Sequence, residues 1–428
     1  MQKEQFIKLI LLTGFILGVM IRVFMLFYKG TYDMDSYVTW GNDTLSQGLH
    51  NAYRGIYFPL QYQLFSIASI FVPILKVDYW IVFKALNLLF DIGIFVLLFN
   101  ILSKLKINPV CSLLYWLHPW FLMVYSLGYI DFHLGFFVLL SIYILLNLKN
   151  NDLVGYIIAG IPIGCAFLLK PQTQCLIVAI GFISLIYYLK TKNYNIFGLL
   201  VFSAVMFLAY SFYFFFSLKP LYFLAKSYLA VSSVMPCLNA DMPNIWYPVA
   251  YFMRPDPALE IYSVSDKLHI LPFISFKALA ALLTTGSICY YSYLISKQMK
   301  EQFSNTVFIL IFSFSFFALP FLMTSAHENH LFVASIFLLI LSFKAKDLFF
   351  KISVHITLLL QCLNISLLYS EDRFFNWLRK LLFGYKIEVR FIFALVSLAF
   401  LTYIFFYFFK TCKTNPFLQE LNEKEVRA

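Results

Sequence analysis

Apolar runs recur along almost the whole chain, and most are about 17 to 25 residues long, enough for a helix to cross a bilayer. The chain has 428 residues, of which 61% are hydrophobic and only 12% are charged. This balance excludes a soluble globular domain. The sequence therefore predicts an all-α integral membrane protein in which residues 1–428 form a single polytopic domain.

The apolar runs divide the chain into about twelve expected transmembrane helices. The first run is too long for the core of a signal peptide and lacks a small-residue cleavage site, so we expect it to be retained. The expected helices are residues 6–27, 78–101, 108–127, 134–148, 153–169, 174–190, 196–217, 273–296, 304–323, 330–343, 350–369 and 390–410.

Lysine-bearing connections predict the topology. If both termini are cytoplasmic, the inner connections are "KLKIN", "KNND", "KTKNYN", "KQMKEQ", "KAKD" and the tail "KTCKTN". Each carries lysine, as the positive-inside rule requires. The net charge of +11 therefore indicates topology and not nucleic-acid binding. The alternation requires residues 60–75 to lie on the outer surface as an interfacial helix.

Two long external loops are expected, at about residues 28–77 and 218–272, with shorter turns near 128–133, 170–173 and 324–329 and a loop near 370–389. Two such loops over a helical bundle favour a site at the outer membrane face. Short lysine-bearing loops, abundant Phe and Ile and no obvious retention signal favour a bacterial plasma (inner) membrane. A eukaryotic source would place the protein in the endoplasmic reticulum membrane.

The stretch "YDMDSYVTW" follows the first apolar run and carries Asp33 and Asp35. The residues after Asp35 recur at helical spacing, so a short helix is expected there. Asp35 is therefore either the cap of that helix or a functional carboxylate. Asp33 is expected to lie before that helix, beside the aromatic belt. There, partial burial and a neighbouring carboxylate would raise its pKa. Such a carboxylate suits a general base that acts on a hydroxyl.

A polar face is also expected on the helix at 78–101. Lys84, Asn87 and Asp91 recur at i, i+3 and i+7, which puts them on one side. Charged groups in membrane helices usually face a partner or a cavity. These three either link the helix to a neighbour or support a site from beneath.

Three predicted outer turns are unusually rich in polar side chains, which favours a common site. Their segments are "GYIDFHLG" with Asp131 and His133, "LLKPQTQ" with Lys170, and "TSAHENHLF" with His327, Glu328 and His330.

Six short motifs, in order over residues 33–330, resemble those of the GT-C superfamily of polytopic glycosyltransferases. The nearest likeness is to the dolichyl-phosphate-glucose-dependent glucosyltransferases of N-glycan precursor assembly and their bacterial relatives. The motifs are "DMDSYVTW", "YFPL" at 57–60, Lys84 seven residues before Asp91, "DFHLG", "NIWY" with Asn244 and Trp246, and "HENH". "DFHLG" lacks one histidine of the family pattern, and Asn329 stands where the family has lysine.

The resemblance implies a GT-C-type bundle whose long external loops carry interfacial helices. It also implies inverting transfer of a hexose from a polyprenyl-phosphate sugar to a hydroxyl of a lipid-linked glycan or similar acceptor. Asp33 and Asp35 would be the catalytic residues, with Asp33 taking the proton of the acceptor hydroxyl. The residues implied in binding the donor phosphate or sugar are His327, Glu328, His330, Lys170, Arg254, Asp131, His133 and Trp246.

No cofactor is expected, although a divalent ion held by Asp33 and Asp35 is a disfavoured alternative. The sugar stays open between glucose and mannose, because GPI mannosyltransferases carry a similar acidic loop. Two other classes also stay open. A polysaccharide polymerase would rely on basic residues in its later loops, and a transporter or flippase for lipid-linked sugars would show repeats and midplane charges.

Overall fold

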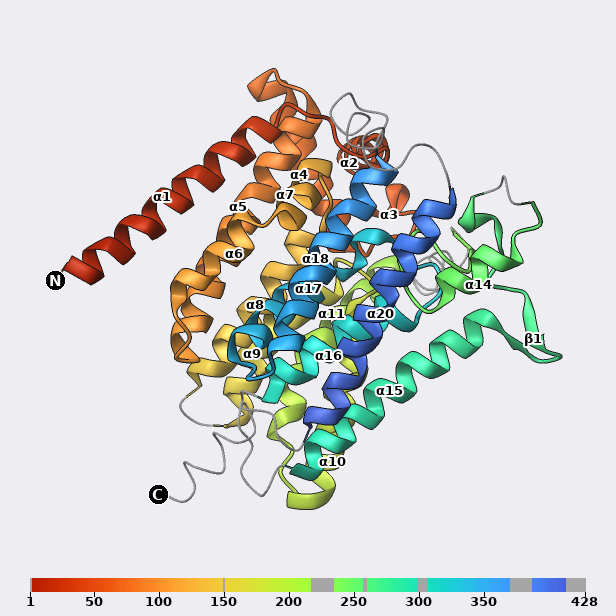
Figure 1. Ribbon diagram of the computed structural model, residues 1–428. Helices are drawn as coiled ribbons and strands as arrows, with labels where there is room; N and C mark the ends of the chain where they lie inside the picture. Colours follow the sequence, from red (N-terminus) through yellow and green to blue (C-terminus); the bar gives the residue numbers. More distant parts are fainter. Residues whose placement is uncertain are drawn as a thin grey trace. The chain divides into compact units, whose positions relative to one another are not determined.

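The computed structural model describes residues 2–148, 151–216, 235–256, 260–298, 307–369 and 387–412 (Figure 1). Within these ranges, seven helices are long and apolar enough to cross a membrane, and a bent helix pair would make an eighth. The only sheet among the described residues is one two-stranded hairpin. The prediction of an all-α membrane protein is confirmed at this level, while the count of twelve spans stays a prediction.

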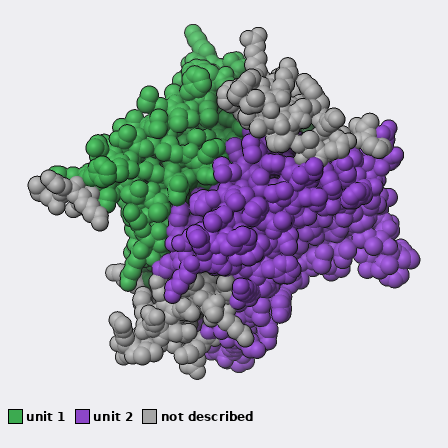
Figure 2. All heavy atoms as spheres, viewed as in Figure 1, with its two compact units in different colours: residues 1–173, 195–234 green, residues 174–194, 235–428 purple. Residues whose placement is uncertain are grey.

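The helices form two compact units, coloured separately in Figure 2. Unit 1 comprises residues 1–173 and 195–234, and unit 2 comprises residues 174–194 and 235–428. Parts of the long loop at 218–272 and most of the loop at 370–389 lie outside the described residues, as do residues 304–306 of one expected helix.

Unit 1 contains most of the N-terminal helices. In it α4 packs against α2 and α5, α5 against α8, and α9 against both α8 and α11. Its elements are α1 (Gln2–Met25), α2 (Asp33–Gln47), α3 (Leu49–Ala52), α4 (Pro59–Leu75), α5 (Tyr79–Lys104), the 3₁₀ helix η1 (Pro109–Cys111), α6 (Ser112–Leu117), α7 (Pro119–Leu127), α8 (Asp131–Asn147), α9 (Leu153–Phe167), the 3₁₀ helix η2 (Asn195–Phe197) and α11 (Gly198–Phe216).

The helix expected at 108–127 is not continuous. It breaks at His118, and its two halves, residues 109–117 and 119–127, are bent by 49°. Pro119 explains the break, because proline has no backbone N–H and disfavours helical geometry in the residue before it. The helix expected at 60–75 is present as α4, whose 17 residues are fewer than those of the seven long spans.

Unit 2 is arranged around α16 and α17, whose side chains are almost all buried. Its elements are α10 (Thr173–Thr191, apart from its first residue), α14 (Trp246–Met253), the 3₁₀ helix η4 (Ile261–Ser263), β1 (His269–Leu271), β2 (Ile274–Ser275), α15 (Phe276–Gln298), α16 (Val307–Leu322), the 3₁₀ helix η5 (Glu328–Leu331), α17 (Phe332–Lys344), α18 (Leu348–Leu368) and α20 (Ile387–Thr411). The hairpin and α14 were not predicted.

The polar face of α5 links this helix to its neighbours, which was one of the two roles expected for Lys84, Asn87 and Asp91. Asp91 accepts hydrogen bonds from Arg22 Nε at 2.5 Å and from the Tyr115 hydroxyl. Asn87 donates to the Tyr129 carbonyl at 3.0 Å. Arg22 and Asp91 are both fully buried, and the guanidinium carbon of Arg22 lies 3.6 Å from the centre of the Trp116 ring. A buried charge pair therefore joins α1 to α5.

Candidate functional site

The turn that precedes Asp33 is hydrogen-bonded to the end of α7. The Thr31 amide donates to the Leu127 carbonyl at 3.0 Å. Gly30 has φ +99°, and a Cβ there would lie 2.3 Å from the same carbonyl oxygen. Lys84 donates to the carbonyls of Tyr28 and Ser126. Lys84 thus fixes the chain on both sides of this contact, which also fits the second interpretation of the α5 face.

The two carboxylates differ in detail from expectation. Asp33 is the first residue of α2 and does not precede it, and its side chain is exposed. Asp35 is not the cap of α2, because Tyr32 occupies that position and makes no side-chain cap bond. Asp35 instead pairs with Lys29 at 2.8 Å in a solvent-exposed ion pair. Both acids still lie in the first turn, where the helix dipole favours negative charge.

Two tyrosines, the buried Tyr37 and the half-buried Tyr57, lie within the electrostatic reach of Asp33. The Tyr37 ring stacks on Phe65, with centroids 4.6 Å apart, and its hydroxyl lies 3.4 Å from that of Tyr57. Burial raises the pKa of the Tyr37 hydroxyl most, and Tyr57, Asp33 and Asp131 raise it further. Burial and the charges of Asp33 and Asp131 likewise raise the pKa of Tyr57. Asp33 and Asp131 therefore act electrostatically on the same two hydroxyls.

Two further predicted turns meet in unit 1. Lys170 Nζ lies 2.8 Å from Asp131 Oδ1, and the two side chains are 5% and 0% exposed. The "YFPL" segment joins the same region through its backbone, since the amides of Phe58 and Leu60 donate to the carbonyls of Leu169 and Leu168, each at 3.1 Å. The structure thus brings Asp131 and Lys170 together with the segment that follows Tyr57.

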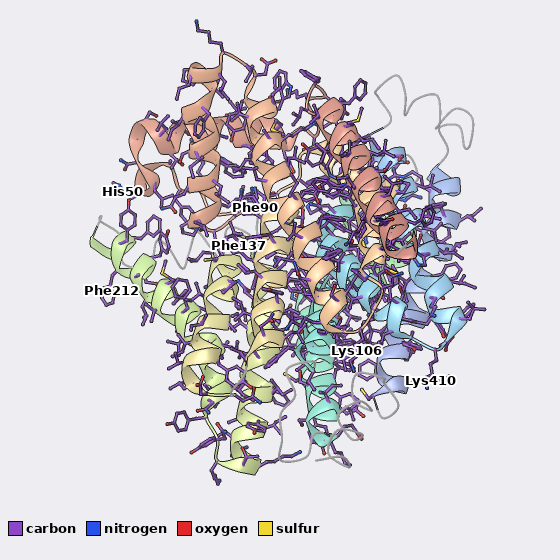
Figure 3. The ribbon with its side chains drawn as sticks, turned by 90° about the vertical axis from the view of Figure 1, so that its left-hand side faces the viewer. His50, Phe90, Lys106, Phe137, Phe212 and Lys410 are labelled. Atoms are coloured by element: carbon purple, nitrogen blue, oxygen red, sulfur yellow. The ribbon has the colours of Figure 1, made fainter. Side chains whose placement is uncertain are left out.

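His133 is fully buried and follows Asp131 by two residues in the first turn of α8. Its Nδ1 lies 3.2 Å from Gln61 Oε1, and the Phe90 ring covers it at 4.5 Å between centroids. The Phe90 ring also lies 6.0 Å from the Phe137 ring between centroids; both residues are labelled in Figure 3. Among the described residues, His133 Nε2, Gln61 Nε2 and both amide atoms of Gln172 are buried without a hydrogen-bond partner. Polar atoms of this kind normally bind water or a ligand.

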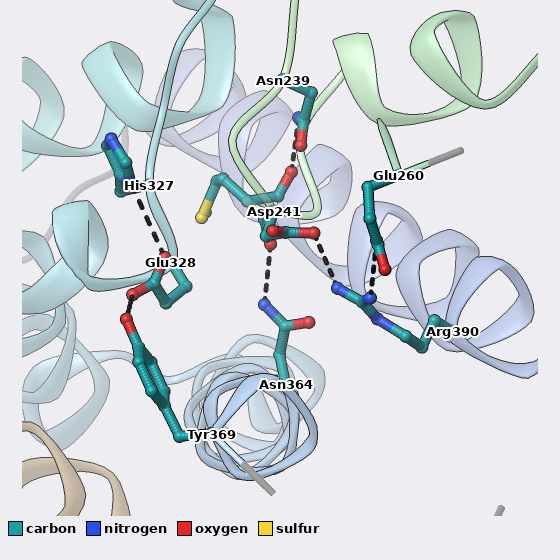
Figure 4. Close-up of polar contacts among 9 residues, drawn as sticks. Asn239, Asp241, Glu260, His327, Glu328, Asn364, Tyr369 and Arg390 are labelled. Atoms are coloured by element: carbon teal, nitrogen blue, oxygen red, sulfur yellow. Dashed lines mark hydrogen bonds and ion pairs between the residues drawn. The ribbon is translucent and has the colours of Figure 1, made fainter. Parts of the chain in front are cut away.

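Unit 2 contains the histidine-bearing turn (Figure 4). Glu328 is buried and accepts a hydrogen bond from the Tyr369 hydroxyl at 3.2 Å, while His327 Nδ1 lies 3.8 Å from its other oxygen. His330 Nδ1 accepts from the His327 amide at 3.2 Å and so caps η5. The imidazole of His327 keeps 36% of its surface exposed.

Asp241 and Arg390 stabilise this turn and were not predicted from sequence. Asp241 adopts φ +66° and pairs through its backbone with His327. Its carboxylate lies 2.6 Å from Arg390, which also reaches Glu260 at 3.3 Å (Figure 4). Burial raises the pKa of Asp241, and Arg390 opposes that shift. Arg390 is the first residue of the expected helix 390–410, and a charged residue at the edge of an apolar run was a usable signal.

The "NIWY" segment has a structural role in unit 2. Asn244 Nδ2 donates to the carbonyls of Pro320 and Met323, both at 3.0 Å, and its Oδ1 accepts from the Trp246 amide. Trp246 is 5% exposed, and its indole N–H donates to the Leu322 carbonyl. Its predicted part in donor binding stays a prediction. Arg254 follows α14 and lies over the Tyr251 ring, 4.2 Å from its centre.

Within the ranges that the structure describes, no three His, Cys, Asp or Glu side chains are arranged to hold a metal ion. No protein-family model matches the chain, and no curated protein matches it either.

Proposed function

We propose that the protein is an inverting glycosyltransferase that acts at the outer face of the membrane in which it lies. It would move a hexose from a polyprenyl-phosphate sugar to a hydroxyl of a lipid-linked glycan or similar acceptor. The observation that carries the proposal is the position of Asp33. Its carboxylate is exposed at the first turn of α2, yet the turn before it is fixed by Gly30, Thr31 and Lys84. An accessible base on a rigid support suits proton transfer.

In the proposed step, the acceptor oxygen attacks the anomeric carbon of the donor while Asp33 takes its proton. The bond between that carbon and the phosphate oxygen breaks, and the lipid phosphate leaves with the electron pair. One displacement inverts the anomeric configuration. Asp35 is paired with Lys29 and is assigned no proton transfer.

Unpartnered polar atoms in unit 1 support a sugar site in the same unit as Asp33. The atoms Gln61 Nε2 and His133 Nε2 are buried and unpartnered within the described residues, and amide and imidazole groups are suited to sugar hydroxyls. Lys170 would stabilise the departing phosphate, but only in competition with Asp131. Glu328, His327, His330 and Arg254 belong to unit 2, and their proposed part at the donor rests on the family resemblance.

The test uses the purified protein in lipid nanodiscs with a panel of polyprenyl-phosphate hexoses and a lipid extract as acceptor. Asp33→Asn removes the base while keeping the size of the side chain, and should lower the transfer rate by about 10²–10⁴-fold. Asp35→Asn is the matched control in the same helical turn and should stay within a few-fold of wild type. Full transfer by Asp33→Asn would rule out the mechanism. Passage of the lipid-linked sugar across a bilayer without bond formation would favour a transporter instead.

A further inference from the structure

An apolar hairpin projects from unit 2 at the start of α15 (Figure 1). In its register, His269 pairs with Ser275 and Leu271 with Ile274, so the turn consists of Pro272 and Phe273. Two-residue hairpin turns usually contain Gly or Asn with a positive φ. Neither Pro272 nor Phe273 has a positive φ. The turn therefore places an apolar tip where a water-exposed hairpin would normally carry polar residues.

The side chains of this hairpin, together with Leu268 just before it, are exposed to an unusual degree. Phe273 is 82% exposed, and Leu271, Leu268 and Ile270 are 51%, 45% and 43% exposed. Two-stranded hairpins are only marginally stable alone in water, and contiguous exposed apolar surface marks a site of interaction. An apolar partner is required to stabilise this arrangement.

The base of the hairpin identifies that partner. Phe276 and Lys277, the first residues of α15, donate backbone hydrogen bonds to the carbonyls of Leu268 and Asp266, each at 3.0 Å. Asp266 is itself buried and accepts from the Thr324 hydroxyl at 3.1 Å. The hairpin is thus fixed to the first turn of α15, one of the seven helices long and apolar enough to cross a membrane. A segment fixed to the end of such a span lies at the level of the lipid headgroups.

We propose that the hairpin His269–Ser275 is an interfacial anchor, with Phe273 and Leu271 at the boundary between headgroups and acyl chains. Lys267 precedes the hairpin and is exposed, so its ammonium group can reach the lipid phosphates while its apolar stem follows the hairpin. The partner is the bilayer itself. The anchor would hold the segment between Asp241 and α15 near the surface that lipid-borne substrates occupy.

The test measures depth in the membrane. A nitroxide is attached at Phe273→Cys in full-length protein whose seven native cysteines are replaced, in nanodiscs containing anionic lipid. Ser263→Cys, on the neighbouring η4 and also exposed, is the matched control. We expect the label at position 273 to collide several-fold more often with oxygen than with a water-soluble nickel chelate, and the label at 263 to show the reverse.

Greater accessibility to the nickel chelate at position 273 would overturn the anchor. Dipolar broadening between labels would overturn it as well, because it would show that a second copy covers the hairpin. The labelled protein must keep the thermal stability of the unlabelled parent, and Ile270→Cys provides a second reporter if Phe273→Cys does not. The measurement involves no sugar transfer, so its outcome is independent of the function proposed for Asp33.

Discussion

Lys170 and Asp131 form a buried ion pair, with Nζ and Oδ1 2.8 Å apart and side chains that are 5% and 0% exposed. The two residues come from separate turns, 39 positions apart in the chain. Taking both charges out of water is costly, and their attraction offsets that cost only while both are present. The pair therefore fixes two turns of unit 1 in one arrangement, and its removal should be measurable.

Lys170→Met should destabilise the protein by about 3–5 kcal/mol, because it leaves the Asp131 carboxylate buried and unpaired. The double variant with Asp131→Asn should recover much of that loss. Lys29→Met is the matched control, since its pair with Asp35 is exposed and worth about 0–1 kcal/mol. Unfolding of the detergent-solubilised protein gives the comparison. A double variant as unstable as Lys170→Met would show that the buried charge is not the cause.

Gly30→Ala should damage the turn before Asp33. A Cβ at Gly30 would lie 2.3 Å from the Leu127 carbonyl oxygen, at φ +99°. Backbone strain of this kind costs about 1–3 kcal/mol, and the displaced turn should also lower sugar transfer. Gly48→Ala is the matched control, because Gly48 has φ +78° but no atom within 4 Å of its Cβ position. Equal losses of stability and transfer in the two variants would contradict a role for the Leu127 contact.

Tyr37 should make stability sensitive to alkaline pH. Burial raises its pKa in the folded state, whereas a tyrosine in the unfolded chain has a pKa of about 10. The folded state then holds the proton more tightly, so this contribution is complete below pH 10 and is lost as pH rises toward the folded pKa. Tyr37→Phe has no proton to lose, so its melting temperature should fall less steeply between pH 9 and 11. Parallel pH profiles for the two proteins would refute the assignment.

The helices could be predicted because their signal is local. An apolar run of sufficient length specifies a membrane helix wherever it packs. Within the described residues, the seven long apolar helices all lie in expected runs, whereas the run at 108–127 is divided into separate helices. The break at His118 was missed although Pro119 was visible, because the run on both sides is continuously apolar. The hairpin at 269–275 was missed for the related reason that its turn lacks Gly and Asn.

The site was harder to predict because its contacts join distant residues. Asp33, Asp131 and Lys170 were predicted as site residues from the sequence. Nothing in their spacing indicated that Lys170 pairs with Asp131. The roles of Tyr37 and Arg390 were missed for the same reason. Tyrosine is common throughout this chain, and the partner of Arg390, Asp241, lies 149 positions away.

The ion pair of Arg22 with Asp91 also bears on how the protein is made. Most of α1 is exposed, and an arginine in an apolar segment is unfavourable in lipid until a partner neutralises it. Asp91 leaves the ribosome 69 residues after Arg22. α1 can therefore reach its final place only after α5 has followed it into the bilayer.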